Sequence, residues 1–89
     1  MTTRMHAVVS GRVQGVGFRW SARAEAQRLG VAGWVRNLPD GTVEAELEGD
    51  EASVDGMLDW LGHGPAGASV DGVEVTSLDA TGSSGFEIR

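Results

Sequence analysis

The sequence predicts an α+β fold in which strands and helices follow one another in the order βαββαβ. Two segments carry apolar residues at helical spacing, at residues 20–29 and from residue 50 onward, and strand-like segments precede, separate and follow them. A Pro-Asp-Gly turn at residues 39–41 lies between two of the strand-like segments, as in a hairpin. We therefore expect an antiparallel sheet with both helices on one face, forming a single domain over residues 1–89.

The first strand and the first helix are predicted from two different periodicities. Residues 4–10 are rich in β-forming residues and alternate apolar with polar side chains, which indicates a strand. Residues 20–29 are rich in Ala, Arg, Glu and Gln, and their apolar side chains recur every three or four positions, which indicates a helix. Gly30 follows at the position where glycine commonly ends a helix.

The hairpin is predicted to pair a strand over residues 31–38 with a strand over residues 42–48. The second of these alternates strictly, so one of its faces is expected to contact the core and the other to contact water. The residues expected to face the core are Val43, Ala45 and Leu47, and those expected to face water are Thr42, Glu44, Glu46 and Glu48.

A second helix is predicted to begin at Asp50, whose side chain is suited to an N-cap. Its apolar residues fall on one stripe, which is expected to pack against the sheet. The stripe consists of Val54, Met57, Leu58 and Leu61. A loop is expected over residues 62–68, a fourth strand over 70–78 and a short terminal strand over 86–89.

Composition restricts the classes of partner. The chain has 89 residues, no cysteine and a net charge of −6, with an isoelectric point near 4.6. An acidic protein is poorly suited to bind nucleic acid or an anionic membrane, so neither is expected as a partner. No apolar run approaches the roughly 20 residues that span a bilayer, and no signal peptide is evident, so a cytoplasmic location is expected.

The charge is unevenly distributed along the chain. Residues 1–24 contain four arginines and no acidic residue, whereas every Asp and Glu lies from Glu25 onward. The N-terminal segment is therefore locally positive within an acidic protein, which favours the approach of a small anion to that one place.

Residues 9–19, VSGRVQGVGFR, contain the arrangement best suited to bind such an anion. Gly11, Gly15 and Gly17 allow backbone conformations in which successive N–H groups converge on one point, and Arg19 adds a permanent positive charge. The N-terminus of the predicted helix follows directly and adds its dipole. An ordinary glycine-rich turn from strand to helix explains the same spacing, because neither GxxxxGK[ST] nor GxGxxG is present.

The segment VSGRVQGVGFR, followed by GWVRNLPDGTVEAELEG at residues 33–49, resembles the paired signature of the acylphosphatase family. The similarity continues through Gly-Pro at residues 64–65 to the closing GFEIR at residues 85–89. The resemblance implies a ferredoxin-like fold and the hydrolysis of acyl phosphates to a carboxylate and inorganic phosphate. It also implies an arginine and an asparagine at the site, which correspond here to Arg19 and Asn37.

These residue types suit that reaction, because a carboxylate leaves without help from a general acid and catalysis depends mainly on charge neutralisation and positioning. Arg19 can hold two phosphoryl oxygens with its planar guanidinium. Asn37 is neutral and can orient the attacking water through its amide. The phosphoryl group is expected to bind the N–H groups of Gln14, Gly15, Val16, Gly17 and Phe18. The expected partner is a small-molecule acyl phosphate, with no cofactor or metal and with the chain as a monomer.

Other residues suggest alternatives. Taken without the resemblance, Asn37 is better explained as a turn-forming residue at the end of its strand. A non-catalytic anion-binding or regulatory module on the same fold is the main alternative function, because a fold does not by itself confer activity. An RNA-binding module of this fold is disfavoured by the acidic charge. His6 and His63 are not expected to bind metal, and Trp20, Trp34 and Trp60 are expected to have packing roles, not to form a platform on which bases stack.

Overall fold

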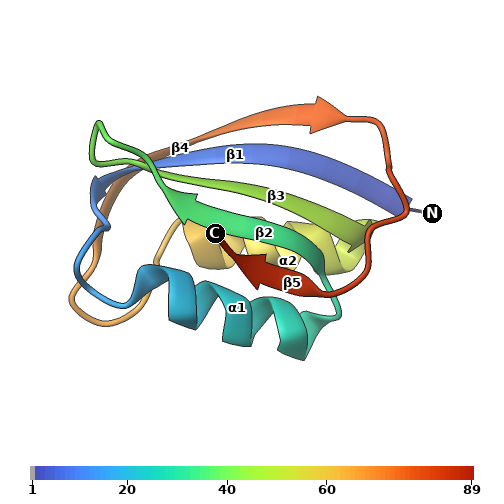
Figure 1. Ribbon diagram of the computed structural model, residues 1–89, viewed down its shortest axis with the longest axis horizontal. Helices are drawn as coiled ribbons and strands as arrows, with labels where there is room; N and C mark the ends of the chain where they lie inside the picture. Colours follow the sequence, from blue (N-terminus) through green and yellow to red (C-terminus); the bar gives the residue numbers. More distant parts are fainter. Residues whose placement is uncertain (1) are drawn as a thin grey trace.

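The structure is a computed structural model that describes residues 2–89. These residues contain five strands and two helices (Figure 1). The elements in chain order are β1 (Thr2–Arg12), α1 (Phe18–Leu29), β2 (Ala32–Asn37), β3 (Val43–Asp50), α2 (Glu51–Leu61), β4 (Ser69–Leu78) and β5 (Phe86–Ile88). All the predicted elements are present, and β1 extends two residues beyond its predicted range at each end.

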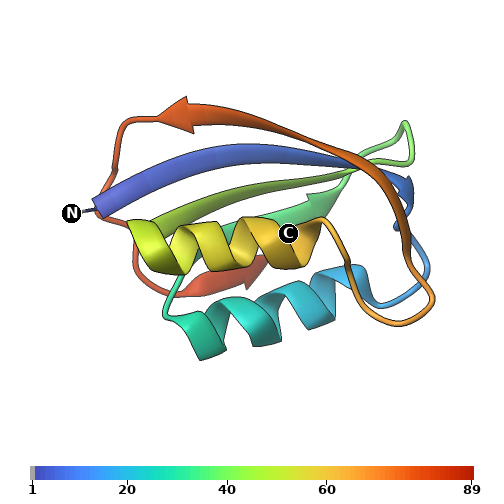
Figure 2. The same cartoon turned by 180° about the vertical axis from the view of Figure 1, so that it is seen from behind.

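The strands form one sheet in the order β4-β1-β3-β2-β5, and both helices cover the same face of it (Figure 2). The four long strands pair antiparallel, as predicted. The last pair, β2 with β5, is parallel, so the sheet is mixed and the expectation of a wholly antiparallel sheet is wrong at this edge. The reason is that residues 79–85 pass across the end of the sheet, so that β5 starts where β2 starts. The architecture is a ferredoxin-like α+β fold with an added edge strand.

The helix ends lie close to their predicted positions. Gly17 precedes α1 in the left-handed region with φ of 75°, so α1 begins at Phe18, two residues earlier than expected. Gly30 ends α1 with φ of 75° and donates its N–H to the Gln27 carbonyl, which confirms the predicted C-cap. Asp50 occupies the N-cap position of α2, but its side chain makes no capping hydrogen bond. Since Asp50 is also the last residue of β3, the chain enters α2 without a loop.

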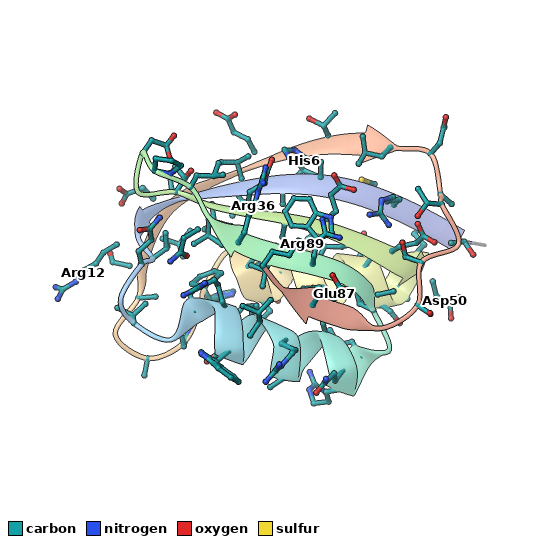
Figure 3. The ribbon with its side chains drawn as sticks, in the orientation of Figure 1. His6, Arg12, Arg36, Asp50, Glu87 and Arg89 are labelled. Carbon is teal, nitrogen blue, oxygen red and sulfur yellow. The ribbon has the colours of Figure 1, made fainter. Side chains whose placement is uncertain are left out.

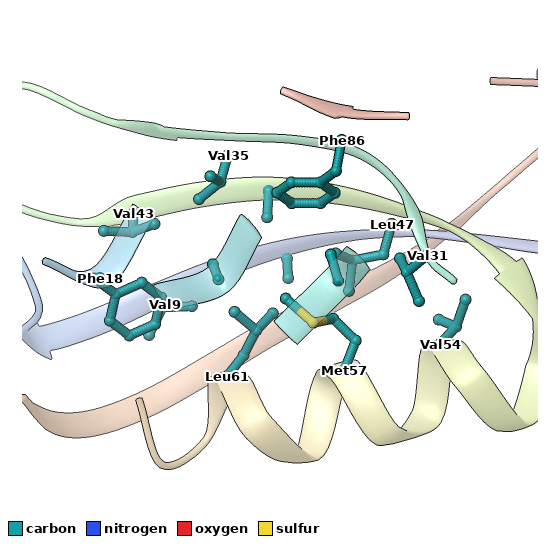
Figure 4. Packing of buried hydrophobic residues seen from close by; sticks show 14 of the residues in the cluster. Val9, Phe18, Val31, Val35, Val43, Leu47, Val54, Met57, Leu61 and Phe86 are labelled. Atoms are coloured by element: carbon teal, nitrogen blue, oxygen red, sulfur yellow. The ribbon is translucent and has the colours of Figure 1, made fainter. Parts of the chain in front are cut away.

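The core lies between the sheet and the two helices (Figure 4). The inward side chains of β3 are fully buried, as the alternation predicted, and Val54, Met57 and Leu61 of α2 pack against them. Leu58, the fourth residue of the predicted stripe, lies at the edge of this contact and is only half-buried. This core holds α1 and α2 against the sheet, and β1 leads directly into the turn before α1.

The acidic side chains of β3 do not simply face water, which corrects the sequence-based expectation. Glu48 is only 3% exposed, because residues 79–85 cover its end of the outer sheet face. Its carboxylate accepts hydrogen bonds from the Thr81 and Gly82 N–H groups, both at 2.8 Å, and from Arg4 Nη1 at 2.9 Å. Glu46 is ion-paired with Arg4 as well, and His6 donates to Glu44 at 2.7 Å. The contacts of Glu44, Glu46 and Glu48 thus connect β3 with β1 and with residues 79–85.

Glu48 makes the stability of the fold depend on pH in the acid range. Hydrogen bonds from the Thr81 N–H, and then from Arg4, lower the pKa of this carboxyl from 4.5 to about 2. Because the folded-state pKa is the lower one, the stabilisation is complete above pH 4.5 and is lost as the pH falls toward about 2. We expect Glu48→Gln to lower the Tm at neutral pH by roughly 10 °C.

The measurement is thermal unfolding followed by circular dichroism between pH 2 and pH 7. Between pH 4.5 and pH 2 the Tm of the wild type should fall by more than the Tm of Glu48→Gln, since the variant has no carboxyl at this position to protonate. Glu74→Gln, on the exposed part of β4, removes one charge as a control and should leave the Tm nearly unchanged. Equal Tm values for Glu48→Gln and wild type at neutral pH would contradict this role.

Candidate active site

A turn over residues 13–17 joins β1 to α1 and borders a small cavity. Gly15 and Gly17 both have φ of 75°, a region that favours glycine, and a Cβ added at either position would meet no atom within 4 Å. Backbone conformation, not crowding, is therefore the reason for glycine at these positions. The cavity has a volume of about 140 Å³. Its lining residues are Val13, Gly15, Gly17, Phe18, Arg19, Trp20 and Asn37.

Arg19 and Asn37 reach this cavity from two different elements. Arg19 lies in the first turn of α1, and Asn37 is the last residue of β2, where it pairs with Val43 of β3. Both side chains are half-buried. Within residues 2–89 the Arg19 guanidinium has no carboxylate partner, and no hydrogen bond joins the Asn37 amide to another side chain. Two strong hydrogen-bonding groups are thus left available to a ligand.

Gln14 holds the turn against the β2–β3 hairpin. Its Nε2 donates to the Leu38 carbonyl at 2.8 Å and to the Thr42 carbonyl at 2.9 Å. Two hydrogen bonds close the hairpin itself. The Leu38 N–H donates to the Thr42 carbonyl at 2.9 Å, and the Thr42 N–H donates to the Asp40 carboxylate at 3.0 Å. Because these contacts connect residues 13–17 with the end of β2, they set the position of Asn37 relative to the turn.

The structure brings most of the predicted site residues together. Gly15, Gly17 and Phe18 line the same cavity as Arg19 and Asn37. The other two predicted residues, Gln14 and Val16, do not line it. Both side-chain donors of Gln14 are used on the hairpin, and the Val16 side chain packs against the core.

Trp20 also lines the cavity, although the sequence predicted a packing role for it. It is 62% exposed. Phe18, Ala22 and Ala26 are spaced four residues apart and occupy the buried stripe of α1, so a residue two positions after Phe18 falls on the opposite side of the helix. Helical spacing within residues 18–29 was therefore a signal that Trp20 is exposed.

The other two tryptophans pack as predicted. The Phe18 ring lies 5.3 Å from that of Trp60, and Trp34 is 9% exposed beneath the guanidinium groups of Arg36 and Arg89. Figure 3 shows Arg36 and Arg89 on the sheet face opposite the helices, close to His6. Trp34 is therefore buried on the outer face of the sheet and Trp60 packs on Phe18, whereas Trp20 is exposed at the cavity.

Unpaired positive charge concentrates around the cavity. Of the seven basic residues, all arginines, four form ion pairs with glutamates. The three arginines without an ion pair in the described residues lie at the end of β1 and in the first half of α1; they are Arg12, Arg19 and Arg23. Figure 3 shows Arg12 extending outward from that end of the sheet. Together with the N-terminal N–H groups of α1, these charges make this end of the molecule attractive to an anion.

The described residues contain no cluster of side chains suited to bind a metal ion. No three His, Asp or Glu side chains within residues 2–89 gather to form a metal site. His63 makes its hydrogen bond to the carbonyl oxygen of Asp59 at 2.8 Å, and His6 makes its contact with Glu44. Neither of the two helices has the length and apolar character needed to cross a membrane.

Comparison with known proteins gives one consistent family. The sequence profile of the acylphosphatase family matches residues 5–88. An acylphosphatase of Anaeromyxobacter dehalogenans is 61% identical over 87 residues, which cover 97% of this chain and 94% of that protein. An acylphosphatase of Rubrobacter xylanophilus is 56% identical over 89 residues, covering 99% of this chain and 81% of the relative.

A solved structure agrees with these sequence relatives. The acylphosphatase of Coxiella burnetii superposes with a TM-score of 0.95 at 40% identity, covering 99% of this chain and 93% of that one. The match includes the strands and helices that carry the turn over residues 13–17 and the end of β2. Sequence profile, sequence relatives and fold agree, and the chain therefore belongs to the acylphosphatase family.

Proposed function

We propose that this enzyme hydrolyses acyl phosphates to a carboxylate and inorganic phosphate in the cavity beside residues 13–17. Family membership supports the reaction class. The observation that carries the assignment to this cavity is that Arg19 and Asn37, both without a side-chain partner in residues 2–89, line it together. A permanent cation can neutralise the phosphoryl oxygens, and a neutral amide can orient the attacking water.

Arg19 and the backbone of the turn bind the phosphoryl group in this proposal. The guanidinium can donate two parallel hydrogen bonds to phosphoryl oxygens, which is a stronger and more directional contact than an ammonium makes. The N–H groups of Gly15, Gly17 and Phe18, at the edge of the cavity and the start of α1, supply further donors. Gln14 and Val16 contribute through their backbone N–H groups only.

Asn37 orients the attacking water in this proposal. Its amide has both an acceptor and donors, so it can fix a water in line with the bond to be broken. The leaving carboxylate is a weak base, so no general acid is needed to expel it. An amide is also too weak a base to remove a proton from the water. This proton therefore passes to the phosphate group itself. A module that only binds anions has no need of such a group.

The test is the release of inorganic phosphate from acetyl phosphate by purified protein, with 4-nitrophenyl phosphate as the comparison substrate. We expect turnover of acetyl phosphate and far slower release of phosphate from 4-nitrophenyl phosphate. The reason is that 4-nitrophenolate is a stronger base than acetate, and so a poorer leaving group, and this cavity has no general acid to assist its departure. Arg19→Ala is the control for a contaminating phosphatase. Phosphate binding without turnover would favour the alternative of a regulatory anion-binding module.

Activity is expected to be independent of metal ions. Arg19 and the N–H groups already supply positive charge to the phosphoryl oxygens, which is the role a metal ion plays in many phosphoryl-transfer enzymes. Dialysis against EDTA should leave kcat and KM for acetyl phosphate within experimental error. Activity lost on chelation and restored by Mg²⁺ or Zn²⁺ would mean that a metal holds the phosphoryl group.

A further inference from the structure

Trp20 is the most exposed large apolar side chain in the described residues. It is 62% exposed, compared with 45% for Val75 and 37% for Leu78. Single exposed apolar side chains are common on protein surfaces, so exposure alone carries no argument. The position of Trp20 does carry an argument, because Trp20 lines the same cavity as Arg19 and Asn37. Val75 and Leu78 lie on β4.

The size of the cavity limits what it can hold. About 140 Å³ corresponds to the volume of about four or five liquid waters. Sites that enclose a whole small-molecule ligand are larger, at about 300–1,000 Å³. A phosphoryl group and an attacking water occupy most of the space beside Arg19 and Asn37, which leaves too little room for the acyl group of the substrate, so that group lies toward the mouth.

Arg23 fixes the orientation of the indole at that mouth. Its guanidinium carbon lies 4.4 Å from the centroid of the Trp20 ring, as expected for a cation stacked on an aromatic face. Arg23 has no ion pair within residues 2–89 that would compete for it. One face of the indole is therefore covered by Arg23, and the rest of this exposed ring is available to a ligand.

We propose that Trp20 is the recognition surface for the acyl group and that it selects acyl phosphates whose acyl group is flat and apolar, such as an aryl group, over short alkyl ones. This inference rests on the proposed function and adds a specificity-determining residue to it. Stacking and apolar contact on an indole grow with the area of the flat group, whereas an acetyl group covers little of the ring. Arg23 acts as a positioning residue through Trp20.

The experiment compares benzoyl phosphate with acetyl phosphate for wild type, Trp20→Ala and Trp20→Phe. Trp20→Ala should raise KM for benzoyl phosphate about tenfold, in line with the loss of one stacking contact, and should change kcat little. KM for acetyl phosphate should change less than about twofold, because its acyl group makes little contact with the ring. Trp20→Phe should keep most of the affinity for benzoyl phosphate, since it retains an aromatic face.

Two further measurements separate recognition from damage to the site. The inhibition constant of inorganic phosphate, which has no acyl group, should be the same in Trp20→Ala and wild type. Arg23→Ala should raise KM for benzoyl phosphate by less than Trp20→Ala does. Any loss that comes from its missing charge should be the same for both substrates and should disappear at high salt. Leu78→Ala, an exposed apolar residue on β4, is the control and should change neither substrate.

The outcomes distinguish this inference from the proposed function. Equal losses for both substrates in Trp20→Ala, or no loss for benzoyl phosphate, would overturn the role of Trp20 while leaving hydrolysis by the wild type intact. If the wild type released phosphate from neither substrate, the proposed function itself would be wrong.

Discussion

Replacing Asn37 with alanine is expected to lower kcat for acetyl phosphate by about two orders of magnitude or more, as for the loss of one positioned catalytic group. Competitive inhibition by inorganic phosphate should change only slightly. The reason is that a neutral amide at the end of β2 adds little to the binding of a dianion that Arg19 and the N–H groups already hold. Steady-state kinetics with phosphate as a product inhibitor measure both quantities.

Two companion variants make the Asn37 result specific. Asn37→Asp is nearly isosteric but places a negative charge beside the phosphoryl group, so it should raise the phosphate inhibition constant as well as lower kcat. Thr42→Val removes the Thr42 hydroxyl contact with Asp40 in the same hairpin, at 2.6 Å, and keeps Asn37. If Thr42→Val lowered kcat as much as Asn37→Ala, the effect would come from a disturbed hairpin. An unchanged kcat in Asn37→Ala would exclude the water-orienting role.

Replacing Arg19 with lysine is expected to be nearly as damaging as replacing it with alanine. Both variants should lower kcat/KM by about 100-fold or more, because an ammonium keeps the charge but cannot reproduce the two parallel hydrogen bonds of a guanidinium. Both should also raise the inhibition constant of inorganic phosphate, in contrast to Asn37→Ala. A lysine variant that retained more than about a third of the wild-type kcat/KM would show that charge alone is sufficient.

Arg12→Ala is the matched control for Arg19. It removes the same charge from the same end of the molecule, but Arg12 is exposed and does not line the cavity. We expect a loss in kcat/KM of less than about threefold, and this loss should disappear at high salt, because an exposed charge acts only through screened long-range attraction. A loss as large as that of Arg19→Ala would mean that the general positive potential, and not the guanidinium contact, determines activity.

Much of the fold followed from local patterns along the chain. The strict alternation in β3 and the spacing of three and four residues in α2 predicted which side chains reach the core, and Val43, Leu47 and Met57 are fully buried. These predictions succeeded because the periodicities of strand and helix are properties of the local backbone. The glycine-rich turn and Arg19 were likewise identified from the residues themselves, and Asn37 through the family resemblance. The structure places the Arg19 and Asn37 side chains at one cavity.

Contacts between distant segments decided what these patterns left open. Glu48 alternates like its neighbours in β3, yet it is buried, because residues 79–85 cross the end of the sheet and surround its carboxylate with donors. The same crossing makes β5 pair in parallel with β2. Neither outcome is visible in a local pattern, since the alternation shows which face a side chain occupies but not what covers that face.

The sequence by itself determined the α+β order of elements, the family and the residue types available for chemistry. Only the tertiary structure decided how these residues are used: Gln14 ties the turn to the hairpin with its side chain, and Trp20 stands exposed at the cavity. The physical reason is that a backbone periodicity depends on neighbours in the chain, whereas burial and hydrogen-bond partners depend on segments that only the folded chain brings together.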